Sequence, residues 1–126
     1  MEITRIKRVS VPVSDQDRAK DFYTSALGFK LLLELPVPMG DNARWIEVAP
    51  DGGETSFILG TWFEGMTPGN LFGLMLETED IAADADALRS SGVEVEGPFD
   101  TPFGTQATFS DPDGNAFVLV QRQEAG

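Results

Sequence analysis

The chain has 126 residues, of which 41% are hydrophobic, and it carries a formal net charge of −12. This composition suits one globular domain with a real core, and the acidic balance argues against nucleic acid, because phosphate binding needs a basic surface. Cysteine and histidine are both missing, which excludes disulfides and Ser-His-Asp or Cys-His catalysis and restricts metal ligands to carboxylates, amides and carbonyls.

The sequence shows no sign of a membrane span or of export. No apolar run approaches the roughly 18 residues that a membrane-spanning helix requires. The first residues, MEITRIKRV, are too short and too polar for a signal peptide. We therefore expect a cytoplasmic protein without a membrane or nucleic-acid partner.

The first elements in chain order are a strand and a helix. Valines that alternate with polar or proline residues from Val9 to Val13 predict a strand with one apolar face. Ser14 is predicted to cap the following helix, with Asp17 completing a box-like pair, and Gly28 to end it in the left-handed conformation. The spacing predicts one buried helix face, formed by Ala19, Phe22, Tyr23, Ala26 and Leu27.

The second half of the chain repeats the order of the first. FGLMLETEDIAADADALRSSGV again reads as a strand, a helix and a glycine, with Ile81, Ala85 and Leu88 on the apolar face of the helix. Pro-Asp-Gly turns precede a late strand in each half, at Pro50 and Pro112. These parallels indicate an internal duplication of about sixty residues, with the pattern βαβββ in each copy.

These segments resemble a known superfamily. Two βαβββ units that carry VSVPVSDQDRAKDFYTSALGF and FSDPDGNAFVLV are similar to vicinal oxygen chelate proteins, which include glyoxalase I, extradiol dioxygenases, fosfomycin-resistance transferases and bleomycin-resistance proteins. The resemblance covers residues about 5 to 122. It implies an α+β fold of two modules, about 5–60 and 71–122, joined by a connector at about 61–70. The modules would form curved mixed sheets around a cavity, in a single domain that pairs as a homodimer.

The resemblance also identifies where a metal would be held. Metal-dependent members place His, Gln or Glu on four strands that face the cavity. Those positions fall here on Arg8, Leu59, Gly73 and Val118. Arginine has no free lone pair at neutral pH, and the other three side chains offer no ligand atom. We therefore predict no metal and no cofactor.

Strand alternation from these four positions predicts an apolar cavity with few polar groups. With the connector and the 94–104 loop added, the predicted ligand-binding residues are Arg8, Ser10, Trp45, Glu47, Phe57, Leu59, Trp62, Gly73, Met75, Phe103 and Val118. Pro12, Leu71, Ala116 and Val120 belong to the same predicted face. The face packed under the helices would hold Val9, Val11, Val13, Ile46, Val48, Ile58, Phe72, Leu74, Leu76, Phe117 and Leu119. Alternation leaves the facing of the strand at 105–110 open.

Several of these residues have two interpretations. Trp45 is either a stacking platform for a ligand or an aromatic of the core or the dimer interface. Glu47 is a general base if burial raises its pKa, and otherwise an exposed strand carboxylate. Arg8 grips an anionic group, pairs with Glu47 or is solvated at the strand end. Trp62, with its connector neighbours Phe63 and Met66, covers the cavity or forms a dimer contact. Phe103, with Phe99, holds an apolar ligand at the cavity mouth or packs over the sheet edge.

Three functions follow as hypotheses. The first is a metal-free protein, like the bleomycin-resistance branch, that holds an apolar or aromatic small molecule, cationic ones included, without chemistry. The second is a metal-free enzyme that uses Glu47 or Arg8 as its catalytic group. The third is a metal-dependent lyase, isomerase or dioxygenase, which the missing ligands argue against because Lewis-acid catalysis needs a held ion.

Overall fold

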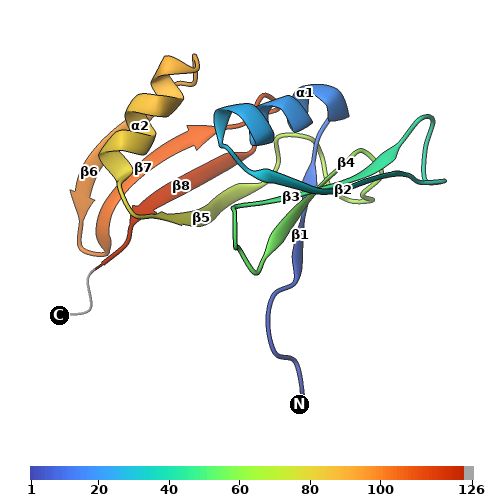
Figure 1. Ribbon diagram of the computed structural model, residues 1–126, viewed down its shortest axis with the longest axis horizontal. Coiled ribbons are helices and arrows are strands. Elements are labelled where there is room, and N and C mark those ends of the chain that lie inside the picture. The colour runs from blue at the N-terminus through green and yellow to red at the C-terminus, as the bar shows by residue number, and fades with distance from the viewer. Residues whose placement is uncertain (124–126) are drawn as a thin grey trace.

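The computed structural model describes residues 1–123 and shows two βαβββ modules side by side (Figure 1). The first module contains β1 (Arg8–Pro12), α1 (Gln16–Asp21), the π-helical turn η1 (Phe22–Ala26), β2 (Lys30–Pro36), β3 (Arg44–Ala49) and β4 (Ser56–Gly60). The second contains β5 (Phe72–Thr78), α2 (Ile81–Ser90), β6 (Glu96–Thr101), β7 (Gly104–Ser110) and β8 (Ala116–Gln121). The predicted α+β fold of two βαβββ units is therefore confirmed. Neither helix of the described chain is long and apolar enough to cross a membrane.

Each module forms a four-stranded mixed sheet with the same topology. Sheet A has the strand order β1-β4-β3-β2, and sheet B has the order β5-β8-β7-β6. The strand that opens each module runs parallel to the last one, and the remaining neighbours are antiparallel. Within residues 1–123, both β1 and β5 consequently lie at a sheet edge and pair with a strand on one side only.

The helices cover one face of each sheet and bury the predicted residues there. Figure 1 shows α1 above the first module and α2 above the second. Ala19 and Tyr23 of the first helical segment are buried, as are Ile81, Ala85 and Leu88 of α2. These side chains and the facing strand residues form the core. Burial of this apolar surface supplies most of the stabilisation of the fold.

The first helix begins one residue later than predicted. Asp15 is the N-cap, and its carboxylate accepts a hydrogen bond from the Arg18 backbone N–H at 3.1 Å. Ser14 instead donates its hydroxyl to Asp113 Oδ1 at 2.5 Å, across the boundary between the modules. Because the Ser14 hydroxyl is hydrogen-bonded to Asp113 in the other module, it does not cap the helix. The predicted stop at Gly28 is confirmed, with φ of +70°.

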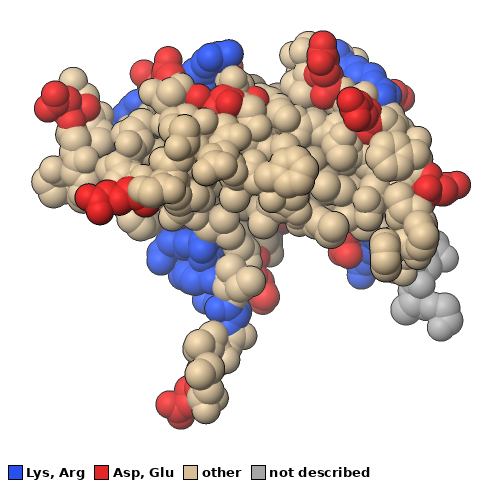
Figure 2. All heavy atoms as spheres, turned by 180° about the vertical axis from the view of Figure 1, so that it is seen from behind, with Lys and Arg blue, Asp and Glu red and all other residues tan. Residues whose placement is uncertain are grey.

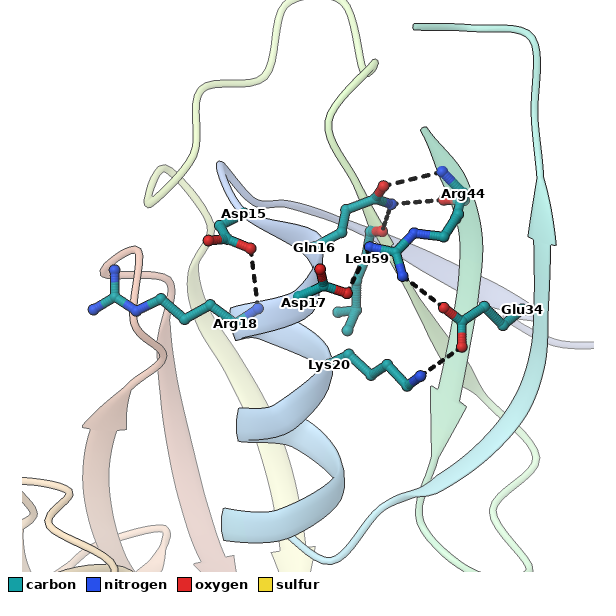
Figure 3. A network of polar contacts seen from close by, with 8 residues as sticks. All are labelled: Asp15, Gln16, Asp17, Arg18, Lys20, Glu34, Arg44 and Leu59. Atoms are coloured by element: carbon teal, nitrogen blue, oxygen red, sulfur yellow. Dashed lines mark hydrogen bonds and ion pairs between the residues drawn. The ribbon is translucent and has the colours of Figure 1, made fainter. Parts of the chain in front are cut away.

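A polar network fixes the start of α1 against sheet A (Figure 3). The buried Gln16 amide donates to the carbonyl of Arg44 at 2.6 Å and to that of Leu59 at 2.7 Å, and its oxygen accepts from Arg44 N–H at 3.0 Å. The Arg44 guanidinium pairs with Asp17 and Glu34, each at 2.8 Å. One glutamine thus satisfies three backbone groups and holds the helix over β3 and β4.

The structure confirms the predicted facing of several strands. Ile46 and Val48 of β3 lie in the core, as do Phe117 and Leu119 of β8, with Leu74 and Leu76 packed against them. The facing of β7, which alternation left open, is now defined. Ala107 and Phe109 point into the core, while Thr108 is opposite Val118 on the other face.

The predicted facing of β4 is wrong. Phe57 and Leu59 lie in the core, 5% and 0% exposed, and are paired in register with Val9 and Val11 of β1. Ile58 belongs to the opposite face, beside Ser10. Every residue of β4 is buried, so the strand is apolar throughout and its alternation carries no signal.

Simple alternation also predicts the wrong facing for the residues at the start of β5. Gly73 has φ of +84° and stands at a register shift between Phe72 and Leu74. This bulge turns Phe72 out of the core, where it is 87% exposed, and Leu71 packs against the core instead. A bulge adds one residue to a strand and reverses the facing of what precedes it.

Candidate functional site

The face of sheet A opposite α1, called here the helix-free face, carries a polar cluster. Arg8 of β1 is in register with Ser56 of β4, and Glu47 of β3 is in register with Ile58. Paired residues of neighbouring strands point to the same side, so Arg8, Glu47 and Ser56 converge on one patch. Two of these three residues belong to the predicted site, and Ser56 does not.

Glu47 is the centre of this cluster. Its two oxygens each accept a hydrogen bond from Arg8 Nε at 3.2 Å. Trp45 Nε1–H donates to Oε1 at 3.1 Å, and the Ser56 hydroxyl donates to Oε2 at 2.7 Å. Glu47 is only 7% exposed, so this carboxylate is buried and fully hydrogen-bonded.

The environment of Glu47 keeps it ionised. Burial raises the pKa of its carboxyl, but hydrogen bonds from Ser56, Trp45 and Arg8 together lower the pKa below its ordinary value. A general base in an apolar pocket needs a raised pKa and a free oxygen. Glu47 has neither, because its lone pairs are already directed at three donors.

Arg8 links the carboxylate to an aromatic surface. Its guanidinium carbon lies 5.7 Å from the centroid of the Trp45 ring, within cation–π distance. Only its Nε bonds Glu47, and within residues 1–123 its terminal nitrogens have no hydrogen-bond partner. The side chain is 43% exposed, so these donors are available on the helix-free face.

Aromatic rings from the connector extend this surface. The rings of Trp45 and Trp62 stack with centroids 6.5 Å apart and an interplanar angle of 27°. Phe63 packs on Trp62 at 5.1 Å. The connector can approach because Gly60 has no side chain: a Cβ there would lie 2.6 Å from the Phe63 ring. Trp62 thus covers part of the helix-free face, a position that fits both of its predicted interpretations.

Apolar side chains from β2 complete the face. Leu33 is in register with Glu47, and Leu35 with Trp45, so both point to the same side as the polar cluster. They are 42% and 51% exposed. Sequence reasoning missed both of these leucines, because the run KLLLELP shows no alternation that would separate two faces.

The remaining predicted site residues lie on sheet B or near it. Met75 is paired with Val118 on the helix-free face of sheet B, where Phe72 lies next to Ala116. Met75 is largely exposed, and Phe103 projects from the turn between β6 and β7. The structure therefore divides the predicted site between two sheets. Only Arg8, Ser10, Trp45, Glu47 and Trp62 belong to the helix-free side of the first module.

Phe57 and Leu59 leave the candidate site altogether. Both side chains point into the core beneath α1, so they cannot line a surface on the opposite face. The resemblance places the second metal ligand on β4, at Leu59. The β4 residues that share a face with Arg8 are instead Ser56, Ile58 and Gly60. Across residues 1–123, no group of three carboxylates lies close enough together to hold an ion.

The sequence model of the Glyoxalase/Bleomycin resistance protein/Dioxygenase superfamily matches residues 5–119. The chain belongs to this superfamily. Its structure is similar to that of TnmS3, an antibiotic-binding protein from Streptomyces sp. CB03234, with 50% identity and a TM-score of 0.92 over 98% of this chain and 99% of that one.

Two further relatives of this chain carry different descriptions from each other. Uncharacterized protein YetH from Bacillus subtilis (strain 168) is 37% identical over 123 residues, covering 94% of this chain and 99% of YetH. A lactoylglutathione lyase from Oryza sativa subsp. japonica is 33% identical over 128 residues, but the match spans only 44% of that protein. The superfamily thus contains both binding proteins and enzymes among the relatives of this chain.

Proposed function

We propose that this protein binds a small aromatic molecule, without a metal, on the helix-free face of sheet A. The observation that carries the proposal is the stacked pair of Trp45 and Trp62 beside the ion pair of Arg8 and Glu47. Similarity to an antibiotic-binding protein over nearly the whole chain supports this choice of ligand class.

The aromatic rings supply the binding energy in this proposal. Large, rigid side chains with a partly exposed face bind a planar ligand with little loss of conformational entropy. Trp45 is held in place by its N–H bond to Glu47 and by the Arg8 guanidinium over its ring. A ligand therefore meets a pre-organised surface, and the exposed leucines of β2 extend its apolar area.

Arg8 gives the site a directional contact. Its terminal N–H groups face the same side as the Trp45 ring and suit a carbonyl, phenolate or carboxylate of the ligand. Glu47 serves in this account as a positioning group that keeps Arg8 and Trp45 in place. The net charge of −12 adds a long-range attraction for ligands that also carry a cationic group.

A metal-free reaction at Glu47 has less support. Its lowered pKa makes it a weak base, and its oxygens are engaged by three donors. A metal-dependent reaction also has little support, since the position on the first strand is occupied by the cation Arg8, which would repel a metal ion.

We also propose that two copies of the chain share each site. The helix-free faces of both sheets expose apolar side chains, among them Leu35, Phe72 and Met75, which is unusual for an isolated soluble chain. If sheet A of one copy meets sheet B of another, these surfaces become the two walls of one cavity.

The experiment is a thermal-unfolding screen of protein treated with a chelator. A panel of aromatic antibiotics that includes bleomycin is added at increasing concentration, with and without divalent ions. A ligand that binds the folded state raises the midpoint in proportion to the logarithm of its concentration. We expect such a rise without metal. A rise that requires an added ion would contradict the proposal.

A further inference from the structure

The strand residues on the helix-free face of sheet A have a net charge opposite in sign to that of the whole protein. Five charged residues occupy the strands of this sheet: Arg8, Lys30, Glu34, Arg44 and Glu47. Glu34 and Arg44 pair with each other at 2.8 Å on the side of α1, where Arg44 also binds Asp17. The other three are two cations and one carboxylate on the helix-free face. They sum to +1, so all other residues together carry −13 of the protein's net −12.

Lys30 belongs to this face because of the register between β2 and β3. It is paired with Ala49, which lies two residues beyond Glu47 and therefore on the same side of β3. Continued by one residue, the register of β3 with β4 brings Ala49 beside Ser56, and Ser56 is the partner of Arg8. One row of the sheet thus runs from Arg8 through two small side chains to Lys30.

Both cations are accessible, whereas the carboxylate between them is not. The terminal nitrogens of Arg8 have no hydrogen-bond partner within residues 1–123, because only its Nε binds Glu47. Lys30 is exposed and forms no ion pair in the same part of the chain. Glu47 is 7% exposed, and its oxygens accept bonds from three donors. A ligand on this face therefore meets positive charge first.

These nearby charges outweigh the acidic surface of the rest of the protein. Salt screens exposed charges over a Debye length of about 8 Å at physiological ionic strength. The Arg8 guanidinium carbon lies only 5.7 Å from the centroid of the Trp45 ring, so a ligand stacked on that ring adjoins it. Figure 2 shows acidic side chains spread around the molecule and basic ones gathered at the base of the N-terminal arm, which leads into Arg8. The acidic surface acts mainly at long range, and the contact is set by the cations.

We propose that the site selects planar aromatic molecules that carry an anionic oxygen group, a carboxylate or an ionised phenol, over neutral and cationic ones. The inference rests on the proposed function, because it assigns a charge to the ligand of that same site. The two terminal nitrogens of Arg8 form a planar fork that matches the two oxygens of a carboxylate. Lys30 adds a weaker attraction from the far end of the row. Arg8 thereby determines specificity as well as affinity.

Calorimetric titration of chelator-treated protein with three probes of one shape tests this charge preference. Naphthoate is an anion at neutral pH, naphthamide is neutral and naphthylmethylamine is a cation, each substituted at the same ring position. We expect naphthoate to bind about tenfold more tightly than naphthamide, and naphthylmethylamine to bind more weakly than either. Equal affinities for naphthoate and naphthamide would overturn the inference and leave aromatic binding intact. Failure of all three probes to bind would contradict the proposed function as well.

Variants of the two cations assign the preference to its source. Arg8→Gln should bring the affinities for naphthoate and naphthamide within about threefold of each other. Lys30→Gln, at an exposed position with no bond to Glu47, should reduce the preference about threefold without disturbing the aromatic surface. Arg18→Gln makes the same change at an exposed position of α1, on the other side of the sheet, and should leave the preference unchanged. A preference that persists in Arg8→Gln would overturn the inference.

Discussion

The hydroxyl of Tyr23 donates a hydrogen bond to Asp111 Oδ2 at 2.7 Å, which joins η1 of the first module to the turn before β8 in the second. Both residues are buried. Asp111 also accepts from the side chain of Asn115, whose amide reaches the Pro12 carbonyl at 2.9 Å. The FSDPDGN segment therefore links the two modules through hydrogen bonds.

Removing the Tyr23 hydroxyl should weaken the link between the modules. Tyr23→Phe leaves the buried Asp111 carboxylate without one of its donors, which we expect to lower the free energy of unfolding by about 1–3 kcal/mol. Chemical denaturation followed by circular dichroism measures the change. Tyr23 is the single tyrosine of the chain, and Phe22→Leu serves as a control for ring packing. Equal stability of Tyr23→Phe and wild type would mean that the bond contributes nothing.

The same hydrogen bond predicts a loss of stability at alkaline pH. Burial and the Asp111 carboxylate raise the pKa of Tyr23 above its ordinary value of 10.0. The folded state thus keeps the proton while the unfolded state releases it, so stability is complete below pH 10 and falls as pH rises above it. This fall should be smaller in Tyr23→Phe. Phenolate absorbance should appear only together with unfolding, and its appearance in the native protein near pH 10 would refute the assignment.

The corrected facing of β4 makes a stability prediction. Leu59→Ala removes a fully buried side chain and should destabilise the protein by about 2–5 kcal/mol. Met75→Ala, at a largely exposed position of the same predicted cavity, should change stability by less than about 0.5 kcal/mol. Urea unfolding of both variants distinguishes the two positions. A small loss of stability in Leu59→Ala would indicate that Leu59 faces the ligand and not the core.

The environment of Glu47 predicts sensitivity to acid. Its pKa is lowered from the ordinary 4.5, so its stabilising contribution is present above that pH and is lost as pH falls through the folded-state pKa. Glu47→Gln should lower the free energy of unfolding by about 1–3 kcal/mol at neutral pH, because the contacts with the half-exposed Arg8 and the buried Ser56 lose a charged acceptor. The difference from wild type should narrow in acid. Glu54→Gln, at an exposed position, is the control, and a constant difference at all pH values would argue against an ionised Glu47.

Part of this molecule was predictable from its sequence because local patterns and tertiary structure agree there. The helix faces around Tyr23 and Leu88 and the core side of β8 follow from regular spacing, which burial on one side enforces. The facing of Trp45 and Glu47 was predictable for the same reason, since Ile46 and Val48 alternate with them.

The predicted facing is wrong on strands where apolar and polar residues do not alternate regularly. β4 is buried on both faces, so Phe57 and Leu59 look no different from Ile58 in sequence. A bulge at Gly73 reversed the facing of Phe72, and a glycine inside a strand was the one available signal. The role of Ser56 required knowledge of the β1–β4 register, which depends on contacts between distant residues. Gln16 gave no signal, because its partners are backbone groups.

The aromatic pair predicts which substitutions weaken ligand binding. Trp62→Ala removes one of the two stacked rings and should raise the dissociation constant for an aromatic ligand about tenfold. Phe22→Leu removes a ring on the helix side of the first module, where Phe22 packs against the core, and should leave affinity nearly unchanged. Equilibrium dialysis of both variants gives the comparison. Equal losses would show that the ligand does not stack on Trp62.

Fluorescence titration of metal-depleted protein tests the central claim most directly, because Trp45 and Trp62 are the only tryptophans of the chain and stack on each other. The ligand is the aromatic antibiotic that gives the largest thermal shift. We predict saturable quenching with the same dissociation constant in chelator and in added Mg²⁺, Mn²⁺, Zn²⁺ or Ni²⁺. Quenching that appears only when an ion is supplied, or ligand binding that leaves both tryptophans unaffected, would contradict a metal-free aromatic site on sheet A.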